Sequence, residues 1–353
     1  MPESSRPRLT RFFHPIVRSS ALGKKPLKVT LWGEEIALFR DAQGVPAAVL
    51  ERCPHRFAPL SAGHVDKEGL LVCPYHGWRF GRDGRGVVPG VPCDRQTRKT
   101  RHFQVVCRHD YLWLADSDVP IGSFPDPASD GYSICGAFTL TFDVPLHVVM
   151  HNVSEDEHLP FVHKTFGWGE KDVKDIFFRV ESDAEEVRVQ YKGRQRSWPG
   201  MQFQFQFAGD LMHNSWVTRF DPFRTAYSLD WTSGDETRLR PLRLRPVLFF
   251  VPVSETRTQL HTFVGATFRD PRLNRLLKLI GPGVTWAARR EFLRDAALIH
   301  QMKDIPKDFR GMSLGRYDKV LVENQKRIDS IYFGQGPSSA VPAQSPGSAA
   351  VVP

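Results

Sequence analysis

The sequence predicts an α+β protein with two domains: a small all-β domain, followed by a larger domain in which helices cover an antiparallel sheet. Between residues 28 and 115, short apolar runs are separated by glycine and proline, which is typical of a β-rich domain. Beyond residue 131, apolar and polar residues alternate with the period of strands, and a segment near residue 295 has helical periodicity. A chain of 353 residues is long enough for two hydrophobic cores.

The boundary between the two domains is expected in "DSDVPIGSFPDPASDG", residues 116–131, which is rich in Pro, Ser, Gly and Asp. We therefore predict a first domain over residues 1–118 and a second domain over residues 119–333. Residues 334–353 are rich in Pro, Ser and Ala, and we expect them to form a disordered tail.

Five segments beyond the boundary are predicted strands, because polar and apolar side chains alternate along them. They are residues 137–144, 187–193, 201–207, 237–244 and 258–268. In "MQFQFQF", the third of them, Met and Phe would lie on one face and Gln on the other. Such an apolar face would be either plain core or the wall of a pocket.

Two short loops of the first domain each offer one thiolate and one imidazole. Cys53 and His55 are followed, after seventeen residues, by Cys73 and His76. A tetrahedral zinc site could use these four ligands, but zinc modules usually group the cysteines in one pair and the histidines in another. A mixed pair in each loop favours a [2Fe-2S] cluster in which one iron binds both sulfurs and the other iron binds both nitrogens.

A second group of candidate ligands lies in "HNVSEDEHLPFVHKTFG". Glu155 and His158 would share one face of a helix. His163 follows five positions later, beyond Pro160, which would distort or end that helix. Two histidines in an acidic segment are also common as surface decoration. His151 is a further histidine here, and a weaker candidate ligand.

The predicted helix over residues 285–305 offers a third ligand, because Asp295 lies within its apolar stripe. A carboxylate on a buried face is costly unless it is paired or bound to a metal. Asp295 would therefore either form a salt bridge with Arg289 or Arg290, or join two histidines in the facial triad of a non-heme Fe(II) oxygenase. Such a triad leaves coordination positions open for dioxygen.

The net charge of +9 is unevenly distributed. Residues 1–118 contain 19 Lys and Arg against 12 Asp and Glu, whereas the remainder contains 29 against 27. The excess is either a solvated face or a surface around "DRQTRKTR", residues 94–101, that steers an acidic electron donor toward the cluster. No recognition motif accompanies it, so no nucleic-acid partner is predicted.

The remaining composition predicts a cytoplasmic protein. No stretch approaches the roughly 18 to 20 apolar residues that span a bilayer, and no signal peptide is apparent, so no membrane association is expected. Three cysteines lie outside the two loops: Cys93, Cys107 and Cys135. An odd number without regular spacing argues against a disulfide framework and for a reducing compartment.

The loop sequences "CPHR" and "CPYHGWRF" resemble the motif of the Rieske non-heme iron oxygenases. Rieske proteins of respiratory complexes carry two further cysteines, where this chain has Ala58 and Tyr75. The second motif is similar, in order and spacing, to that of the oxygenase alpha subunits; its residues are Asn152, Glu155, His158, His163 and Asp295. The resemblance covers nearly the whole chain short of the tail. It is closest to the short branch that contains vanillate and dicamba O-demethylases and aminopyrrolnitrin oxygenase.

This resemblance implies a helix-grip fold for the second domain and a role for each candidate residue. The [2Fe-2S] cluster would be held by Cys53, His55, Cys73 and His76, and a mononuclear Fe(II) by His158, His163 and Asp295. Glu155 stands where the family usually has an Asp that bridges a cluster histidine of one subunit to an iron histidine of the next. Glu is longer by one methylene, roughly 1.5 Å.

The implied function is monooxygenation of an apolar or aromatic small molecule with O2 as co-substrate: hydroxylation, demethylation or N-oxidation. Electrons would come from NAD(P)H through a reductase or ferredoxin. The working form would be a homotrimer, a ring that places one subunit's cluster beside the next subunit's iron. Trp286 and the Phe-rich sheet would suit an apolar substrate. Two alternatives remain open: an arene cis-dihydroxylating dioxygenase, and a non-enzymatic Rieske electron carrier with a hydrophobic-ligand domain.

Overall fold

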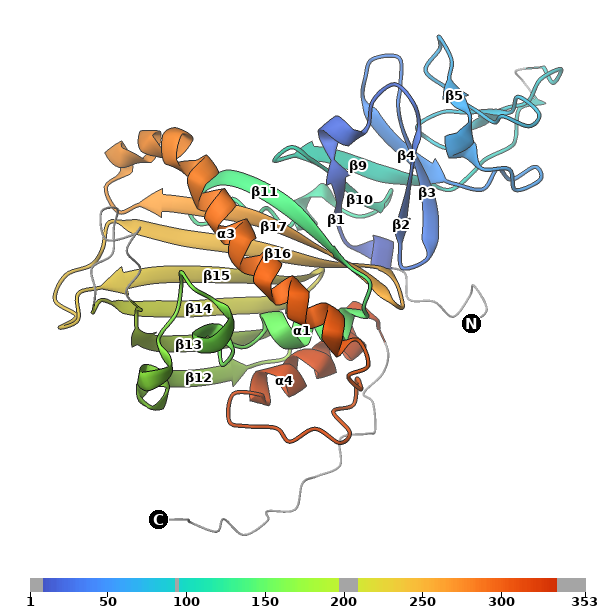
Figure 1. Cartoon of the computed structure of the whole chain (residues 1–353). Coiled ribbons are helices and arrows are strands. Elements are labelled where there is room, and N and C mark those ends of the chain that lie inside the picture. The colour runs from blue at the N-terminus through green and yellow to red at the C-terminus, as the bar shows by residue number, and fades with distance from the viewer. Residues whose placement is uncertain (1–8, 93–94, 197–208, 335–353) are drawn as a thin grey trace.

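The computed structural model describes residues 9–92, 95–196 and 209–334. They form a smaller all-β part, drawn from blue to teal, and a larger part in which helices lie against a sheet (Figure 1). The predicted α+β class is therefore confirmed. The predicted strand over residues 201–207 and the predicted tail beyond Gly334 lie outside the described residues.

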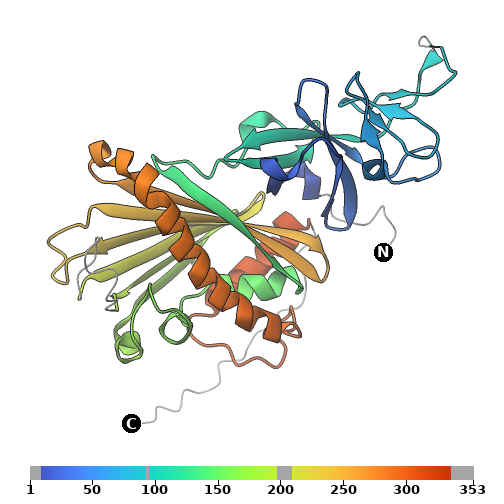
Figure 2. The same cartoon turned by 45° about the horizontal axis from the view of Figure 1, so that its top comes forward.

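The smaller part contains two antiparallel sheets. One has six strands in the order β1-β10-β9-β4-β3-β2, and the other has the order β5-β6-β7-β8. The bounds of the strands are β1 (His14–Arg18), β2 (Leu27–Leu31), β3 (Glu34–Arg40), β4 (Pro46–Leu50), β5 (His64–Val65), β6 (Leu71–Val72), β7 (Arg79–Phe80), β8 (Gly86–Val87), β9 (His102–Arg108) and β10 (Tyr111–Asp116). The four short strands, β5 to β8, are inserted in the chain between β4 and β9. They lie at the end of the smaller part that is farthest from the sheet of the larger part (Figures 1 and 2).

The larger part is built on one antiparallel sheet of seven strands in the order β11-β17-β16-β15-β14-β13-β12. The bounds of the strands are β11 (Ser133–Phe142), β12 (Phe177–Ser182), β13 (Glu186–Arg194), β14 (Leu211–Phe220), β15 (Phe223–Thr232), β16 (Leu242–Ser254) and β17 (Arg257–Phe268). The helices are α1 (Leu146–Val153), α2 (Leu159–Val162), α3 (Leu277–Ile299) and α4 (Lys319–Arg327). The long α3 crosses one face of this sheet (Figure 1). On the same face α1 packs against β16 and β17, and α4 packs against β12 and β13.

Three of the predicted strands are found within β11, β13 and β17. The predicted strand over residues 237–244 is wrong for its first half, because β16 begins only at Leu242. Ser233 and Arg238 close a turn before it: the N–H of Ser233 donates to the carbonyl of Arg238 (2.8 Å), and the hydroxyl of Ser233 accepts from the N–H of Arg238 (3.0 Å). Local side-chain hydrogen bonds thus prevail over the alternating pattern.

The predicted helix over residues 285–305 is present but displaced. α3 begins at Leu277 and ends at Ile299, after which a 3-10 turn covers residues 300–302. The helix approaches β11 closely: a Cβ on Gly136 would lie only 2.7 Å from Oγ1 of Thr285. Glycine at this position therefore lets α3 lie directly on the sheet.

Backbone hydrogen bonds and aromatic packing join the two parts. In the turn between β2 and β3, the N–H groups of Trp32 and Gly33 donate to the carbonyls of Pro252 and Val253, both at 2.8 Å. Trp113 of β10 packs edge-on against Phe249 of β16, with ring centroids 4.9 Å apart. Among the described residues, none of the helices combines the length and the apolar character needed to cross a bilayer.

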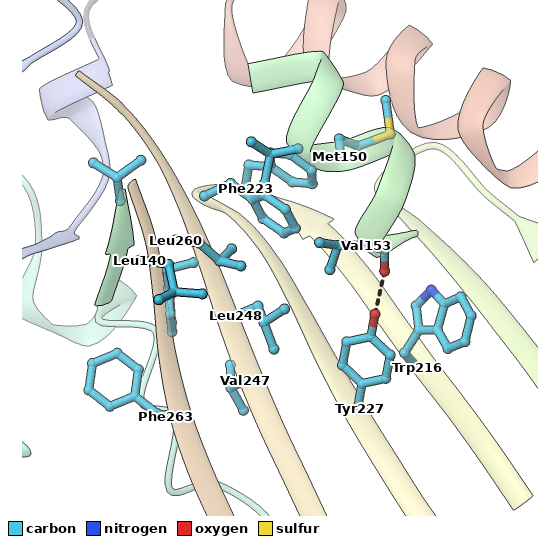
Figure 3. Packing of buried hydrophobic residues seen from close by; sticks show 14 of the residues in the cluster. Leu140, Met150, Val153, Trp216, Phe223, Tyr227, Val247, Leu248, Leu260 and Phe263 are labelled. Atoms are coloured by element: carbon cyan, nitrogen blue, oxygen red, sulfur yellow. Dashed lines mark hydrogen bonds between the residues drawn. The ribbon is translucent and has the colours of Figure 1, made fainter. Parts of the chain in front are cut away.

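The core under α1 fixes the segment that carries the second group of candidate ligands. Val153 of α1 points toward buried side chains of the sheet (Figure 3). The hydroxyl of Tyr227 donates a hydrogen bond to the carbonyl of Val153, the last residue of α1. The C-terminal end of α1 is thereby tied to β15, directly before Glu155 and His158.

Candidate metal centres and the cavity beside them

The two Cys–His loops have matching backbone conformations. In each loop the cysteine N–H donates to the carbonyl five residues later, and the N–H four residues later donates back to the cysteine carbonyl, at 2.7–3.1 Å. Phe57 and Gly77, each four residues after its cysteine, both have positive φ, 59° and 67°. The first loop precedes β5 and the second joins β6 to β7, so neighbouring strands bring the two turns together.

The four side chains form an inner sulfur pair and an outer imidazole pair. Cys53 and Cys73 are 1% and 3% exposed, whereas His55 and His76 are exposed, with ring centroids 4.6 Å apart. Burial, reinforced by the neighbouring Cys73 thiol, raises the pKa of Cys53 to about 11, although backbone N–H groups directed at its sulfur oppose the rise. Such N–H groups suit a metal-bound thiolate. These residues therefore fit a [2Fe-2S] cluster with its nitrogen-bound iron at the surface.

Trp78 supports the outer imidazole pair. Its indole stacks on His55, with ring centroids 4.6 Å apart and an interplanar angle of 3°. The stacked ring holds the imidazole plane without using either nitrogen, so both nitrogens of His55 stay available.

The second group of candidate ligands lies on a turn between two helices. α1 ends at Val153 and α2 begins at Leu159, so the predicted single helix through Glu155 and His158 is wrong. The Glu155 carboxylate accepts hydrogen bonds from the backbone N–H groups of Glu157 and His158, which turns the chain back. It also accepts one from Nδ1 of His158, at 2.6 Å. The predicted proximity of Glu155 and His158 is therefore achieved by a turn.

Pro160 has a different role from the predicted one. It does not end a helix but occupies the first turn of α2. The first N–H groups of a helix have no partner within it, so a proline here breaks no helical hydrogen bond. The helix ends two residues after Pro160, and His163 is its C-cap.

His158, His163 and Asp295 converge on one point, with one ligand atom of each within 4.8 Å of the others. Nε2 of His163 lies 2.9 Å from Oδ1 of Asp295, and Nε2 of His158 lies 3.5 Å from the same oxygen. The two Nε2 atoms are 3.3 Å apart. The alternative arginine partners, Arg289 and Arg290, are exposed on α3. Two imidazoles and one carboxylate in this arrangement are the donors of a facial triad.

The charges within this group are complementary. Burial opposes protonation of His158, but hydrogen bonds with Asp295 and Glu155 outweigh it and raise the pKa of this imidazole to about 10. Burial would raise the pKa of Asp295, yet hydrogen bonds from the two histidines hold it below its usual value. Carboxylates that stabilise positive charge at this point also suit a divalent cation.

Glu291 is a member of the site that the sequence reasoning missed. It is buried on α3, one turn before Asp295, and Oε2 lies 3.0 Å from Nδ1 of His163. Thr165 donates to its other oxygen at 2.7 Å, and Arg294 pairs with the same oxygen. Burial opposes ionisation, but hydrogen bonds from His163 and Thr165 prevail and lower the pKa of Glu291 to about 2. The signal for it was a carboxylate four residues before Asp295, on the same helix face.

A cavity of about 110 Å³ opens beside this group, between the sheet and α3. Its walls are mostly apolar and include Leu229 and Val264 of the sheet and Val284 and Phe292 of α3. Trp286, which the sequence suggested for an apolar pocket, does not line it: the side chain is 60% exposed, with the Arg290 guanidinium 5.4 Å from its ring centre.

Comparison with known proteins identifies the first domain. Residues 13–104 match the family model described as the Rieske [2Fe-2S] domain. This chain carries a Rieske domain. A stretch of 186 residues is 33% identical to the oxygenase component of chloroacetanilide N-alkylformylase from Rhizorhabdus wittichii (strain DC-6 / KACC 16600). This match covers 45% of this chain and 50% of that protein. A stretch of 153 residues is 35% identical to the oxygenase component of dicamba O-demethylase from Stenotrophomonas maltophilia, covering 40% and 44%.

The predicted resemblance to Rieske oxygenase components is therefore confirmed, although the matched stretches span half or less of these relatives. The fold match extends over both domains. The crystal structure of dicamba monooxygenase bound to dicamba superimposes with a TM-score of 0.69, covering 92% of this chain and 97% of that chain at 22% identity. The chain thus shares the fold of that structure over nearly its whole length.

Three other candidates lie outside the two centres. His151 is buried and stacks on Phe309 at 4.9 Å, away from the triad, and neither of its ring nitrogens has a hydrogen-bond partner in the part of the chain that the structure describes. Arg101, in the predicted donor-steering segment, is engaged with Glu34 and Asp116, whereas Arg98 and Lys99 are exposed. The described cysteines outside the loops, Cys107 and Cys135, are free thiols, and Cys93 lies outside the described residues.

Proposed function

We propose that the protein is a Rieske oxygenase that uses O2 and electrons from a reductase or ferredoxin to monooxygenate an apolar small molecule. The observation that carries this proposal is the convergence of His158, His163 and Asp295 beside an apolar cavity, in a chain that also carries a Rieske domain. In this proposal residues 1–118 form the domain that accepts electrons, and residues 119–333 form the domain that binds oxygen and the substrate.

In this proposal Cys53, His55, Cys73 and His76 hold the [2Fe-2S] cluster, and His158, His163 and Asp295 hold a mononuclear Fe(II). The bound iron supplies open coordination positions for dioxygen, and the protein supplies binding and orientation. The apolar walls of the cavity bind the substrate and exclude bulk water. Glu155 and Glu291 each accept a hydrogen bond from Nδ1 of one histidine, which directs both Nε2 atoms to the metal position.

We further propose that electrons cross between subunits of a homotrimer. Within one chain the Cys–His loops lie at the outer end of the Rieske domain, on the side away from α3 (Figures 1 and 2). A head-to-tail ring would bring one subunit's loops to the next subunit's triad. Glu155 already binds His158 of its own chain, and the exposed His55 or His76 of a neighbour would be its second partner. Asp156 cannot take the place of Glu155 as the bridge between subunits, because its carboxylate is hydrogen-bonded to Asn214.

A non-enzymatic electron carrier is the weaker alternative, because it assigns no function to His158, His163 and Asp295. Two histidines that contact three carboxylates, in a mostly apolar wall, are costly to bury unless a ligand uses them. Arene cis-dihydroxylation would use the same residues, and the mass of the product distinguishes it from monooxygenation.

The test is a single-turnover experiment with the whole protein, reduced by dithionite or by a surrogate reductase and supplied with ¹⁸O2. A panel of methoxy- and N-methyl-arenes serves as substrates, and products are read by mass. The proposal expects one labelled oxygen atom in the product, or in the formaldehyde released by demethylation. Incorporation of two labelled atoms indicates the dioxygenase. If every compound leaves the rate of oxygen consumption equal to the rate at which the reduced cluster is oxidised without substrate, the protein is a carrier and the proposal fails.

A further inference from the structure

The cavity beside the triad contains a polar pair that neither metal centre uses. Asp156 and Asn214 both line it and are 4% and 5% exposed. Nδ2 of Asn214 donates to Oδ2 of Asp156 at 2.6 Å. Asn214 lies on β14, facing α3, among apolar side chains such as Met212 and Leu229.

This hydrogen bond fixes which end of the Asn214 amide is free. Since Nδ2 must face the carboxylate, the carbonyl Oδ1 faces the other way, and no donor among the described residues reaches this buried oxygen. Oδ1 of Asn152, also in the cavity wall, is likewise buried and has no partner within the described part of the chain. Tyr227 cannot satisfy either oxygen, because its hydroxyl proton is donated to the carbonyl of Val153. Buried acceptors without a donor cost about 1–3 kcal/mol each, so the site favours a ligand that donates.

The charge of the cavity wall adds a second restriction. Its described residues include the carboxyl groups of Glu155, Asp156, Glu291 and Asp295 but neither Lys nor Arg. Two arginines that contact residues of this wall are already engaged: Arg294 pairs with Glu291, and Arg196 donates to the carbonyls of Leu159, His163 and Trp168. Residues 197–208, which the structure does not describe, contain no Lys or Arg in sequence. A buried anionic substrate would therefore have no Lys or Arg in the described wall to pair with.

We propose that the substrate of this site is an apolar molecule that carries an N–H or O–H donor and no negative charge, and that Oδ1 of Asn214, oriented by Asp156, receives that donor. This inference rests on the proposed function, since it concerns the substrate of the same cavity. It makes Asn214 a specificity-determining residue and Asp156 a positioning residue. The competing role of the pair is structural: it would only tie the turn at residues 154–158 to β14.

Equilibrium dialysis of the holoprotein against three matched probes tests this inference without turnover. The probes are 4-methoxybenzamide, which donates N–H; N,N-dimethyl-4-methoxybenzamide, which has no donor; and 4-methoxybenzoate, which is an anion. We expect the primary amide to bind at least about tenfold more tightly than either of the others, a ratio that corresponds to about 1.4 kcal/mol. Equal or weaker binding of the primary amide overturns the inference.

Three variants separate recognition from tethering. Asn214→Leu should reduce the affinity ratio between the primary amide and the N,N-dimethyl amide to about twofold or less, because it removes the acceptor. The exchange Asp156→Asn/Asn214→Asp should keep the preference for the primary amide, because it retains the paired side chains and an acceptor at position 214. Ser215→Ala, the neighbour on the opposite face of β14, is the matched control and should keep the wild-type ratios. If Asn214→Leu keeps the wild-type ratios, the pair is only a tether and the inference is wrong.

The dialysis result and the proposed function fail separately. Binding ratios are measured whether or not product forms, so a protein that turns over with equal probe affinities refutes only the substrate inference. A protein with the expected ratios but without mononuclear iron refutes only the oxygenase proposal.

Discussion

Nε2 of His163 lies 2.9 Å from Oδ1 of Asp295, although 132 residues separate them in the chain. α2 carries one residue to this point and α3 carries the other across the open face of the sheet. His158 reaches the same point because the turn at residues 154–158 folds back on the Glu155 carboxylate. The site is thus assembled from two helices and a turn that the sheet holds in place.

Glu291→Gln should weaken iron binding without removing a ligand. The neutral amide accepts a weaker hydrogen bond from Nδ1 of His163, so the imidazole is less firmly oriented and less basic. Such outer partners typically change metal affinity by about 10–100-fold. Competition with a chelator measures this affinity, and Glu170→Gln, an exposed change in the 3-10 helix Glu170–Asp175, should leave it as in the wild type. Equal affinities in both variants would mean that Glu291 only pairs with Arg294.

Glu155→Gln should separate electron supply from iron binding. His55 or His76 of a neighbouring subunit loses its acceptor, while His158, His163 and Asp295 remain. We expect an unchanged cluster spectrum and most of the mononuclear iron, but single-turnover product lower by orders of magnitude. Glu157→Gln is the control, because Glu157 is exposed on the same turn. Glu155→Asp keeps the charge and should recover transfer. Normal turnover in Glu155→Gln, or an active monomer in sedimentation, would contradict the route between subunits.

Arg98→Glu/Lys99→Glu should slow reduction of the cluster by an acidic ferredoxin or reductase domain. Both side chains are exposed on the Rieske domain, whereas Arg101 is excluded from the test because it pairs with Asp116. Stopped-flow reduction at low salt should be several-fold slower, and the difference should vanish at high salt, since exposed charges are screened over about 8 Å at physiological ionic strength. Lys171→Glu/Lys303→Glu, an equal charge change on exposed residues of the second domain, should have little effect. Identical rates in both pairs would leave the basic excess as a solvated surface.

His151→Phe should retain all iron and make the protein more resistant to acid. Burial, with the nearby His147, lowers the pKa of His151 to about 3. In the unfolded chain the imidazole has its ordinary pKa of about 6.5 and binds a proton that the folded state does not, so the native protein loses stability as pH falls from about 6.5 toward 3. At pH 5 this costs roughly 2 kcal/mol.

Thermal denaturation at pH 7.5 and pH 5 measures this effect. The midpoint should fall less for His151→Phe than for the wild type, because phenylalanine does not titrate and can keep the stacking on Phe309. An equal fall in both proteins would show that His151 is protonated when folded, and loss of iron would make it a ligand.

The periodicity of the sequence predicted elements better than their contacts. Strands β11, β13 and β17 were found because their alternation reflects one buried face. The turn at residues 154–158 was missed because it depends on the side chain of Glu155 capping N–H groups, which a helical spacing of Glu155 and His158 does not reveal. Helix geometry and this turn happen to place the same two residues together.

The candidate ligands could be predicted because residue type and spacing restrict metal chemistry strongly. Their supporting residues could not. Glu291 contacts His163 across the gap between α3 and α2, and Asp156 contacts Asn214 across the gap between the turn and β14. The first contact depends on the distance between α3 and α2 and the second on the distance between the turn and β14, and no local pattern encodes either distance. The prediction that Trp286 would suit an apolar pocket was wrong for a similar reason, since the helical stripe does not reveal which edge of α3 faces solvent.

The count of iron atoms tests the two-centre account most directly. Protein purified without air should hold close to three irons per chain, because the account places a two-iron cluster and one further iron in each chain, and should show the Rieske EPR signal when reduced. His158→Ala should hold about two irons and keep that signal, because the Cys53–His55 and Cys73–His76 loops are untouched. Three irons in His158→Ala, or loss of the Rieske signal together with the third iron, would contradict the account.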